Sequence, residues 1–224
     1  MNNSGNKPDV EKKQTPSART ERTAEHAADA AKHTAGQVKE APVTYEAYYN
    51  MPDDGNRYEV ADGKLELMSP GPTTTHQLLA TELYSRLRDD CRNEYLIIVS
   101  PIDVKLAETE VRQPDIVLIR RDRMAIVEKR CINGSPDLVI EITGKYSYRR
   151  DKLKKTKVYA KYGVPEYWIV DPDNATLEQY VLQADGAYVL ADVYSEDEIV
   201  RSERLTCAVF NMNELMRGIP QLPQ

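Results

Sequence analysis

The stretch PDLVIEI at residues 136–142 decides the fold of this chain of 224 residues. A short, nearly continuous aliphatic run that follows a proline is typical of a strand covered on both faces of a sheet. Glu141 interrupts this run, and an acid inside so apolar a strand has to be paired, metal-bound or neutralised. The stretch therefore predicts a central strand that carries a functional acid.

A second run, QPDIVLI at residues 113–119, places Asp115 at the entry to another aliphatic strand. If the two strands are neighbours in one sheet, Asp115 and Glu141 come together at one place. Asp115 and Asp137 both follow a proline, so either side chain could instead cap the start of its strand. We favour a functional role for Asp115 and a structural one for Asp137.

Turn signals and hydrophobic spacing divide the rest of the chain into helices and strands. Asp62-Gly63 and Asp185-Gly186 are hairpin signals, and Gly163 is a natural residue to end a helix. We expect helices over residues 44–49, from about 74 onward, 148–162 and 211–216, and strands over residues 57–60, 64–68, 95–99, 102–106, 116–119, 137–142, 166–170, 177–182 and 187–193. This order predicts an α/β (α+β) fold with a central mixed β-sheet flanked by α-helices.

Composition separates a tail from a domain. Residues 1–41 contain no aromatic residue and almost no large aliphatic one. Such a segment cannot bury enough surface to offset the entropy lost on ordering. We expect a disordered N-terminal tail over residues 1–41 and one folded domain over residues 42–224.

Cysteine spacing and hydropathy indicate a soluble, cytoplasmic protein. Cys91, Cys131 and Cys207 show no metal-ligand spacing, which predicts buried or inert thiols rather than a disulfide or a zinc site. No apolar run approaches the ~18 residues of a membrane span, so we expect no membrane partner. The net charge of −6 requires any contact with nucleic acid to rest on a local basic patch.

Acidic and basic side chains near the two strands suit hydrolysis of a phosphodiester bond. Asp115 and Glu141 could hold Mg²⁺, which usually takes one or two protein carboxylates and keeps several waters. Lys155 could orient the attacking water or stabilise the transition state as a point charge. Glu59 could be a further metal ligand. The leading interpretation is a metal-dependent endonuclease acting on DNA.

Other polar residues allow two interpretations, one functional and one structural. Arg149, Arg150 and Lys154 lie in the one dense basic run of the chain, which suits a phosphate backbone but could also be the solvated face of a helix. His76 could be a general base or a phosphate contact, or it could belong to a helix start as a structural residue. Tyr167 and Trp168 are expected in the core.

The chain resembles the Uma-two restriction endonuclease family, a branch of the PD-(D/E)XK nuclease superfamily, over about residues 43–216. The blocks that carry the resemblance are YEVADG at 58–63, LMSP at 67–70, His76, QPDI at 113–116, PDLVIEI at 136–142 and, most specifically, YAKYGVPEYWIVDP at 159–172. The resemblance implies the restriction endonuclease-like fold and Mg²⁺ or Mn²⁺ at the site. It also implies that Asp115 is the motif aspartate, Glu141 the second acid, and Glu59 an acidic residue near the metal.

The chain departs from the superfamily pattern at the lysine. That lysine would fall two residues after Glu141, where this chain has Thr143. In the family, the helix that follows carries Asp-x-x-x-Lys, which Asp151 and Lys155 match here. Lys145, in a loop that also differs from the family, could compete for the role, and we favour Lys155.

Two alternatives to a DNA endonuclease remain open at this stage. The altered loop after Glu141 and the negative net charge also suit a catalytically inactive module that binds nucleic acid or a protein partner. A phosphoesterase acting on RNA or a small substrate would use the same carboxylates and lysine. Nucleases that cut both strands commonly pair two sites, so a homodimer is a further expectation.

Overall fold

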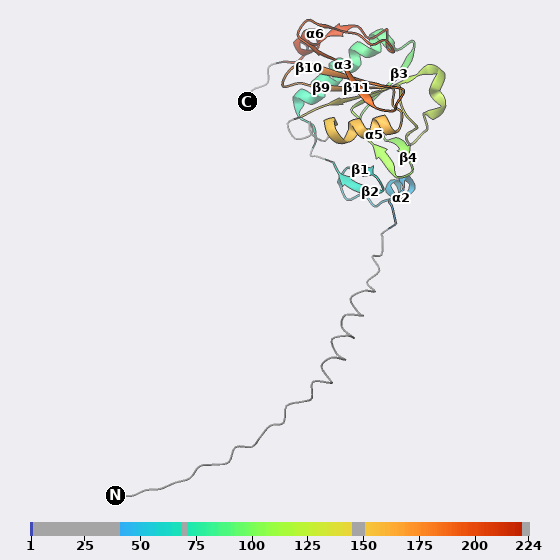
Figure 1. Cartoon of the computed structure of the whole chain (residues 1–224), viewed down its shortest axis with the longest axis vertical. Helices are drawn as coiled ribbons and strands as arrows, with labels where there is room; N and C mark the ends of the chain where they lie inside the picture. Colours follow the sequence, from blue (N-terminus) through green and yellow to red (C-terminus); the bar gives the residue numbers. More distant parts are fainter. Residues whose placement is uncertain (2–40, 69–70, 145–150, 221–224) are drawn as a thin grey trace. The chain divides into compact units, whose positions relative to one another are not determined.

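The computed structural model describes residues 1, 41–68, 71–144 and 151–220 (Figure 1). The chain divides into two units, Met1–Ala41 and Pro42–Gln224, and all described helices and strands belong to the second. Most of the predicted tail therefore lies outside the described residues. Among those residues, no helix is both long and apolar enough to cross a membrane.

A mixed sheet of six strands forms the centre of the second unit. Its strands, in spatial order, are β11 (Tyr188–Ser195), β10 (Thr176–Leu182), β9 (Glu166–Asp171), β8 (Leu138–Ile142), β6 (Ile116–Arg120) and β3 (Tyr95–Val99). The pair β8–β9 is parallel and the other neighbours are antiparallel. The predicted mixed central sheet is confirmed, with the stretch at 136–142 supplying a strand from its middle.

A second sheet has five shorter strands. They are β2 (Lys64–Leu67), β1 (Tyr58–Ala61), β5 (Glu110–Arg112), β4 (Val104–Ala107) and β7 (Ile132–Asn133). A small pair, β12 (Ile199–Val200) and β13 (Phe210–Asn211), stands apart, and a 3-10 helix η1 covers Arg121–Ile126. Five elements were not predicted because each is too short to show a periodic pattern: β5, β7, β12, β13 and η1.

Some of the helices begin at residues whose side chains cap them. The helices are α2 (Tyr45–Tyr49), α3 (Thr74–Cys91), the π-helical turn η2 (Asp151–Lys155), α5 (Thr156–Lys161) and α6 (Met212–Arg217). Thr44 and Thr73 accept hydrogen bonds from the first turns of α2 and α3. The helix expected over residues 148–162 is described from Asp151 as a π-helical turn that continues into α5. It ends at Lys161, and Gly163, whose φ of 74° suits glycine, follows the cap residue Tyr162.

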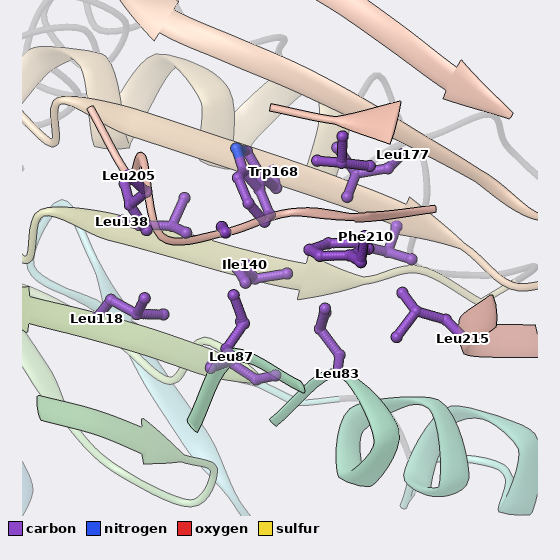
Figure 2. Close-up of a cluster of buried hydrophobic side chains, with 14 of the residues drawn as sticks. Leu83, Leu87, Leu118, Leu138, Ile140, Trp168, Leu177, Leu205, Phe210 and Leu215 are labelled. Carbon is purple, nitrogen blue, oxygen red and sulfur yellow. The ribbon is translucent and has the colours of Figure 1, made fainter. Parts of the chain in front are cut away.

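The two faces of the six-stranded sheet carry two separate cores, because successive residues of a strand point to opposite faces. One core contains Leu138, Ile140 and Trp168 from the strands, with Leu83 and Leu87 of α3 packed against them (Figure 2). The other core contains Val117, Val139, Tyr167 and Ile169, with Tyr159 of α5. Tyr167 and Trp168 are fully buried, as expected.

The prediction of three separate thiols is wrong. Cys91, at the end of α3, forms a disulfide with Cys207, and their Cα atoms lie 5.3 Å apart. Cys131 remains a free, buried thiol. The two bonded residues are separated by 116 positions in the chain, so their pairing depends on the packing of α3 and leaves no trace in local spacing.

Candidate active site

The register of two central strands brings Asp115 and Glu141 together. In the antiparallel pair β6–β8, Ile116 lies opposite Ile140, so the same register places Asp115 opposite Glu141. Side chains directly opposite each other in an antiparallel pair share a face, with Cβ atoms about 4.5–5.5 Å apart. Both carboxylates therefore lie on the face of the sheet that α5 covers.

Asp115 is held by two donors on one oxygen. Its Oδ2 accepts hydrogen bonds from the backbone N–H of Ile142 (2.8 Å) and from Nε2 of His76 (3.1 Å). His76 lies in the first turn of α3, whose cap at Thr73 fixes the start of the helix. The side chain of Asp115 is 19% exposed, and Oδ1 accepts no hydrogen bond within the described part of the chain. This oxygen is open to a further contact.

Glu141 is almost completely buried, with 3% of the residue exposed. Its Oε1 accepts hydrogen bonds from the ammonium of Lys155 (2.7 Å) and the hydroxyl of Tyr159 (2.8 Å). Burial, followed by the charge of Glu141, raises the pKa of Tyr159 well above its ordinary value. The hydroxyl therefore stays protonated and acts as a donor to Glu141.

Glu59, on β1, belongs to the same buried group of charges. Lys155 Nζ lies 3.5 Å from Oε1 of Glu59, which also accepts a hydrogen bond from the backbone N–H of Gln113 (2.9 Å). Arg112 Nη1 donates to Oε2 (3.2 Å), and its Nε donates to Glu110 Oε1 (2.7 Å). Burial alone would lower the pKa of Arg112, but Glu59 and Glu110 outweigh it and raise that pKa.

Arg112 and Glu110 were not predicted as site residues, although each is only 3% exposed. They alternate with Val111 in a strand of three residues, a pattern that looks like a solvated loop. The one available signal was the spacing of two opposite charges at i and i+2, which places both side chains on one face of a strand.

The basic residues predicted to contact nucleic acid have different positions. The side chain of Lys154 is 63% exposed and contacts Glu66 (3.3 Å), whereas its neighbour Lys155 points into the buried cluster. Lys145, Arg149 and Arg150 lie outside the described residues. Asp151 begins η2, and its side chain is also outside them.

The donor set fits a hard divalent cation that keeps some of its waters. Asp115 contributes an oxygen that is partly exposed, and Glu141 lies opposite it. Across residues 41–68, 71–144 and 151–220, no group of three or more His, Cys, Asp or Glu side chains is gathered closely enough to hold a metal. Glu59 contacts Arg112 and Lys155 instead of completing a set of three ligands.

Known proteins resemble this chain in sequence and in fold. The Uma2 (Uma-two) family model, described as "Putative restriction endonuclease", matches residues 45–212. A crystal structure of "a putative nuclease belonging to DUF820" from Anabaena variabilis has a TM-score of 0.64 at 20% identity, covering 79% of this chain and 99% of that one. At this identity the likeness shows the fold alone.

A second solved structure is less similar to this chain. The type IIG restriction endonuclease BpuSI has a TM-score of 0.37 at 12% identity, covering 67% of this chain and 18% of that one. That score is too low to support an argument. No curated protein matches the chain.

Proposed function

The chain belongs to the Uma2 family of restriction-endonuclease-like proteins, and from that premise we propose that it is a divalent-metal-dependent endonuclease that hydrolyses phosphodiester bonds in DNA. One observation carries the proposal: Asp115 lies opposite Glu141, and the ammonium of Lys155 lies 2.7 Å from Glu141. Two carboxylates that can hold a divalent cation, with an ammonium beside them, can activate a water and stabilise the charge that develops during phosphodiester hydrolysis.

Asp115 and Glu141 would hold Mg²⁺ or Mn²⁺. The bound ion would lower the pKa of a water and neutralise charge developing on the phosphate. Asp115 would hold the ion with its carboxylate, whose orientation is set by the hydrogen bonds from Ile142 and His76. In this proposal His76 is a positioning residue, and Glu59 is the further acidic group near the metal.

Lys155 takes the part of the lysine that the superfamily pattern would put at Thr143. The buried hydroxyl of Thr143 donates to the carbonyl of Val170 (3.2 Å), so residue 143 contributes to the sheet rather than to the site. Lys155 reaches Glu141 from η2 instead. Because its ammonium is already fixed between Glu141 and Glu59, it can orient the attacking water or the phosphate without further ordering.

The proposed partner is DNA. Lys154 presents its charge to solvent next to the site, and Arg149 and Arg150 precede it in the sequence. We propose that these three residues contact the phosphate backbone, where such contacts set position and affinity. A homodimer would supply a second site for the other strand, and sedimentation with and without duplex DNA would test it.

The test is cleavage of supercoiled plasmid, single-stranded DNA and RNA with Mg²⁺ or Mn²⁺. Asp115→Ala should abolish cleavage without unfolding the domain. Lys155→Met should reduce the cleavage rate by about a hundredfold or more. Lys154→Met changes the exposed neighbouring residue, so this variant should bind DNA less tightly and keep most of its cleavage rate at saturating DNA. Circular dichroism checks folding, because removing a buried cation costs about 3–5 kcal/mol.

Each outcome of this assay selects one reading. Cleavage by Asp115→Ala at the parent rate would refute the proposed site. Cleavage of RNA with all DNA left intact would make the protein a ribonuclease. A folded parent that binds DNA and cleaves none of the substrates would point to the inactive module instead.

A further inference from the structure

A pocket of about 230 Å³ lies beside the candidate active site, between α2 and the segment that leads into β1. Its walls include three tyrosines, Tyr48, Tyr49 and Tyr58, together with Asp103 and Gln113. The volume is smaller than the ~300–1,000 Å³ of sites for drug-sized ligands. The pocket therefore suits a single ring system with aromatic neighbours.

Asp103 is the polar group that gives this pocket its chemistry. Its Oδ1 accepts hydrogen bonds from the amide of Gln113 (2.8 Å) and the hydroxyl of Tyr48 (3.4 Å). Both donors are neutral, and burial raises the pKa of the carboxyl group. Oδ2 accepts no hydrogen bond from any described residue, so an added N–H donor would stabilise the carboxylate.

The charge of the pocket selects against phosphate. Asp53 and Asp54 line it together with Asp103, and Arg57 is its one basic side chain. The guanidinium of Arg57 already donates to Oε1 of Gln113 (2.6 Å). Three carboxylates repel a phosphate group but attract the N–H edge of a planar heterocycle.

The backbone connects the pocket to the candidate active site. Gln113 stands two residues before Asp115, so their Cα atoms are at most about 7 Å apart. The backbone N–H of Gln113 also donates to Glu59 (2.9 Å). A group bound against Gln113 could therefore belong to the same strand as a phosphate at Asp115.

We propose that this pocket receives one unstacked nucleobase next to the scissile phosphate, with the Asp103 carboxylate accepting N–H bonds from the Watson–Crick edge of the base. The inference rests on the proposed nuclease function and deepens it. Guanine fits best, because that edge carries adjacent N–H donors, whereas thymine has one N–H between two carbonyl oxygens. A base leaves the stack most readily in single-stranded or mismatched DNA, so such DNA is the preferred substrate.

The test measures binding without metal, so that it does not depend on catalysis. Fluorescence anisotropy of the full chain would compare thymine oligonucleotides that carry one central guanine or one central abasic position. The parent should bind the guanine strand about tenfold or more tightly, the scale of one stacked and hydrogen-bonded base. Asp103→Asn should lose this preference, and Asp89→Asn, a carboxylate 61% exposed on α3, should keep it.

A second variant protects the test against misfolding. Tyr49 is 46% exposed, so Tyr49→Ala should leave the fold intact. It should reduce the preference for guanine, because the bound base loses an aromatic neighbour. Equal affinity of the parent for the guanine and abasic strands would overturn the proposal. Competition by an arginine amide, with no preference for guanine, would also overturn it and identify a cation site instead.

The two proposals fail in different ways. A parent that cleaves DNA but shows no guanine preference would refute the pocket and leave the nuclease. A folded parent that keeps the preference, loses it in Asp103→Asn, and cleaves nothing would refute the nuclease and leave a base-binding pocket.

Discussion

Two buried glutamates on neighbouring strands differ in what surrounds them. Glu141 is near the end of β8 and Glu166 is at the start of β9, and the parallel register sets them at opposite ends of the pair. They are 3% and 0% exposed. Glu166 accepts hydrogen bonds of 2.7 Å from Trp168, Gln179 and Ser202, all neutral donors, whereas Glu141 contacts the ammonium of Lys155.

This difference shows that burial alone does not identify a functional acid. Ser202, which donates to Glu166, also accepts hydrogen bonds from the backbone N–H groups of Arg204 and Leu205. Glu166 thereby fastens the segment between β12 and β13 to the sheet. Glu141 lies opposite an acid that reaches solvent. A cation partner and an accessible second carboxylate separate the candidate active site from the structural anchor.

The strongest test of this comparison replaces each glutamate by glutamine. Glu141→Gln should lower the rate of metal-dependent cleavage by about a hundredfold to a thousandfold, because it removes a charged group at the reacting centre. Glu166→Gln should keep the rate but lose about 1–3 kcal/mol of stability, because an amide nitrogen then faces a buried donor. Cleavage assays and urea denaturation of both variants measure the two effects.

Two results would break the distinction between the glutamates. Full cleavage activity in Glu141→Gln would show that the Glu141 carboxylate takes no part in cleavage. Loss of activity in a folded Glu166→Gln, at temperatures where it is as folded as the parent, would mean that the anchor also shapes the site.

A smaller effect is expected at His76, which contacts Asp115 (3.1 Å) and in our proposal positions it. His76→Ala leaves the backbone N–H of Ile142 as the remaining donor to Oδ2 among the described residues, so the carboxylate is less well oriented. Loss of such a supporting hydrogen bond typically costs 10–100-fold in metal affinity. Cleavage measured against Mn²⁺ concentration should therefore require more metal and recover at saturation. A rate that stays low at saturating Mn²⁺ would instead indicate a general base.

The parts of the fold with a local signal were predictable. The turn at Asp62-Gly63 is an example, because both residues have positive φ, 49° and 73°, as the tight hairpin turn of this kind requires. β5 has no such signal. Its three residues form a strand because β1 and β4 lie on either side and pair with its backbone. Tertiary context, rather than propensity, decides its structure.

The candidate site was predictable only where a residue's local setting was unusual. Glu141 stood out because its neighbours are aliphatic. Glu166 begins an equally apolar strand, and its sequence setting does not reveal that its partners are neutral. Arg112 is buried beside Glu59 by strand pairing alone, and Cys91 meets Cys207 only after α3 packs on the sheet. Contacts between distant segments are absent from local patterns.

The smallest effect is expected at Tyr159, and it depends on pH. Tyr159→Phe removes the hydrogen bond to Glu141, which should cost about 1.5–3 kcal/mol near neutral pH. In the native parent, burial and Glu141 raise the pKa of Tyr159 well above 10.0. In the unfolded chain the tyrosine hydroxyl has a pKa of about 10.

Above that pH the unfolded parent releases a proton that the native state retains, so the contribution of Tyr159 to stability falls as pH rises. Phenylalanine has no such proton. The difference in unfolding free energy between the parent and Tyr159→Phe should therefore become smaller between about pH 8 and about pH 11. Urea denaturation measures this difference, and Tyr49→Phe, at an exposed tyrosine, is the control. A deficit that stays constant across this range would mean that the hydroxyl ionises equally in both states, which contradicts its place as a buried donor to Glu141.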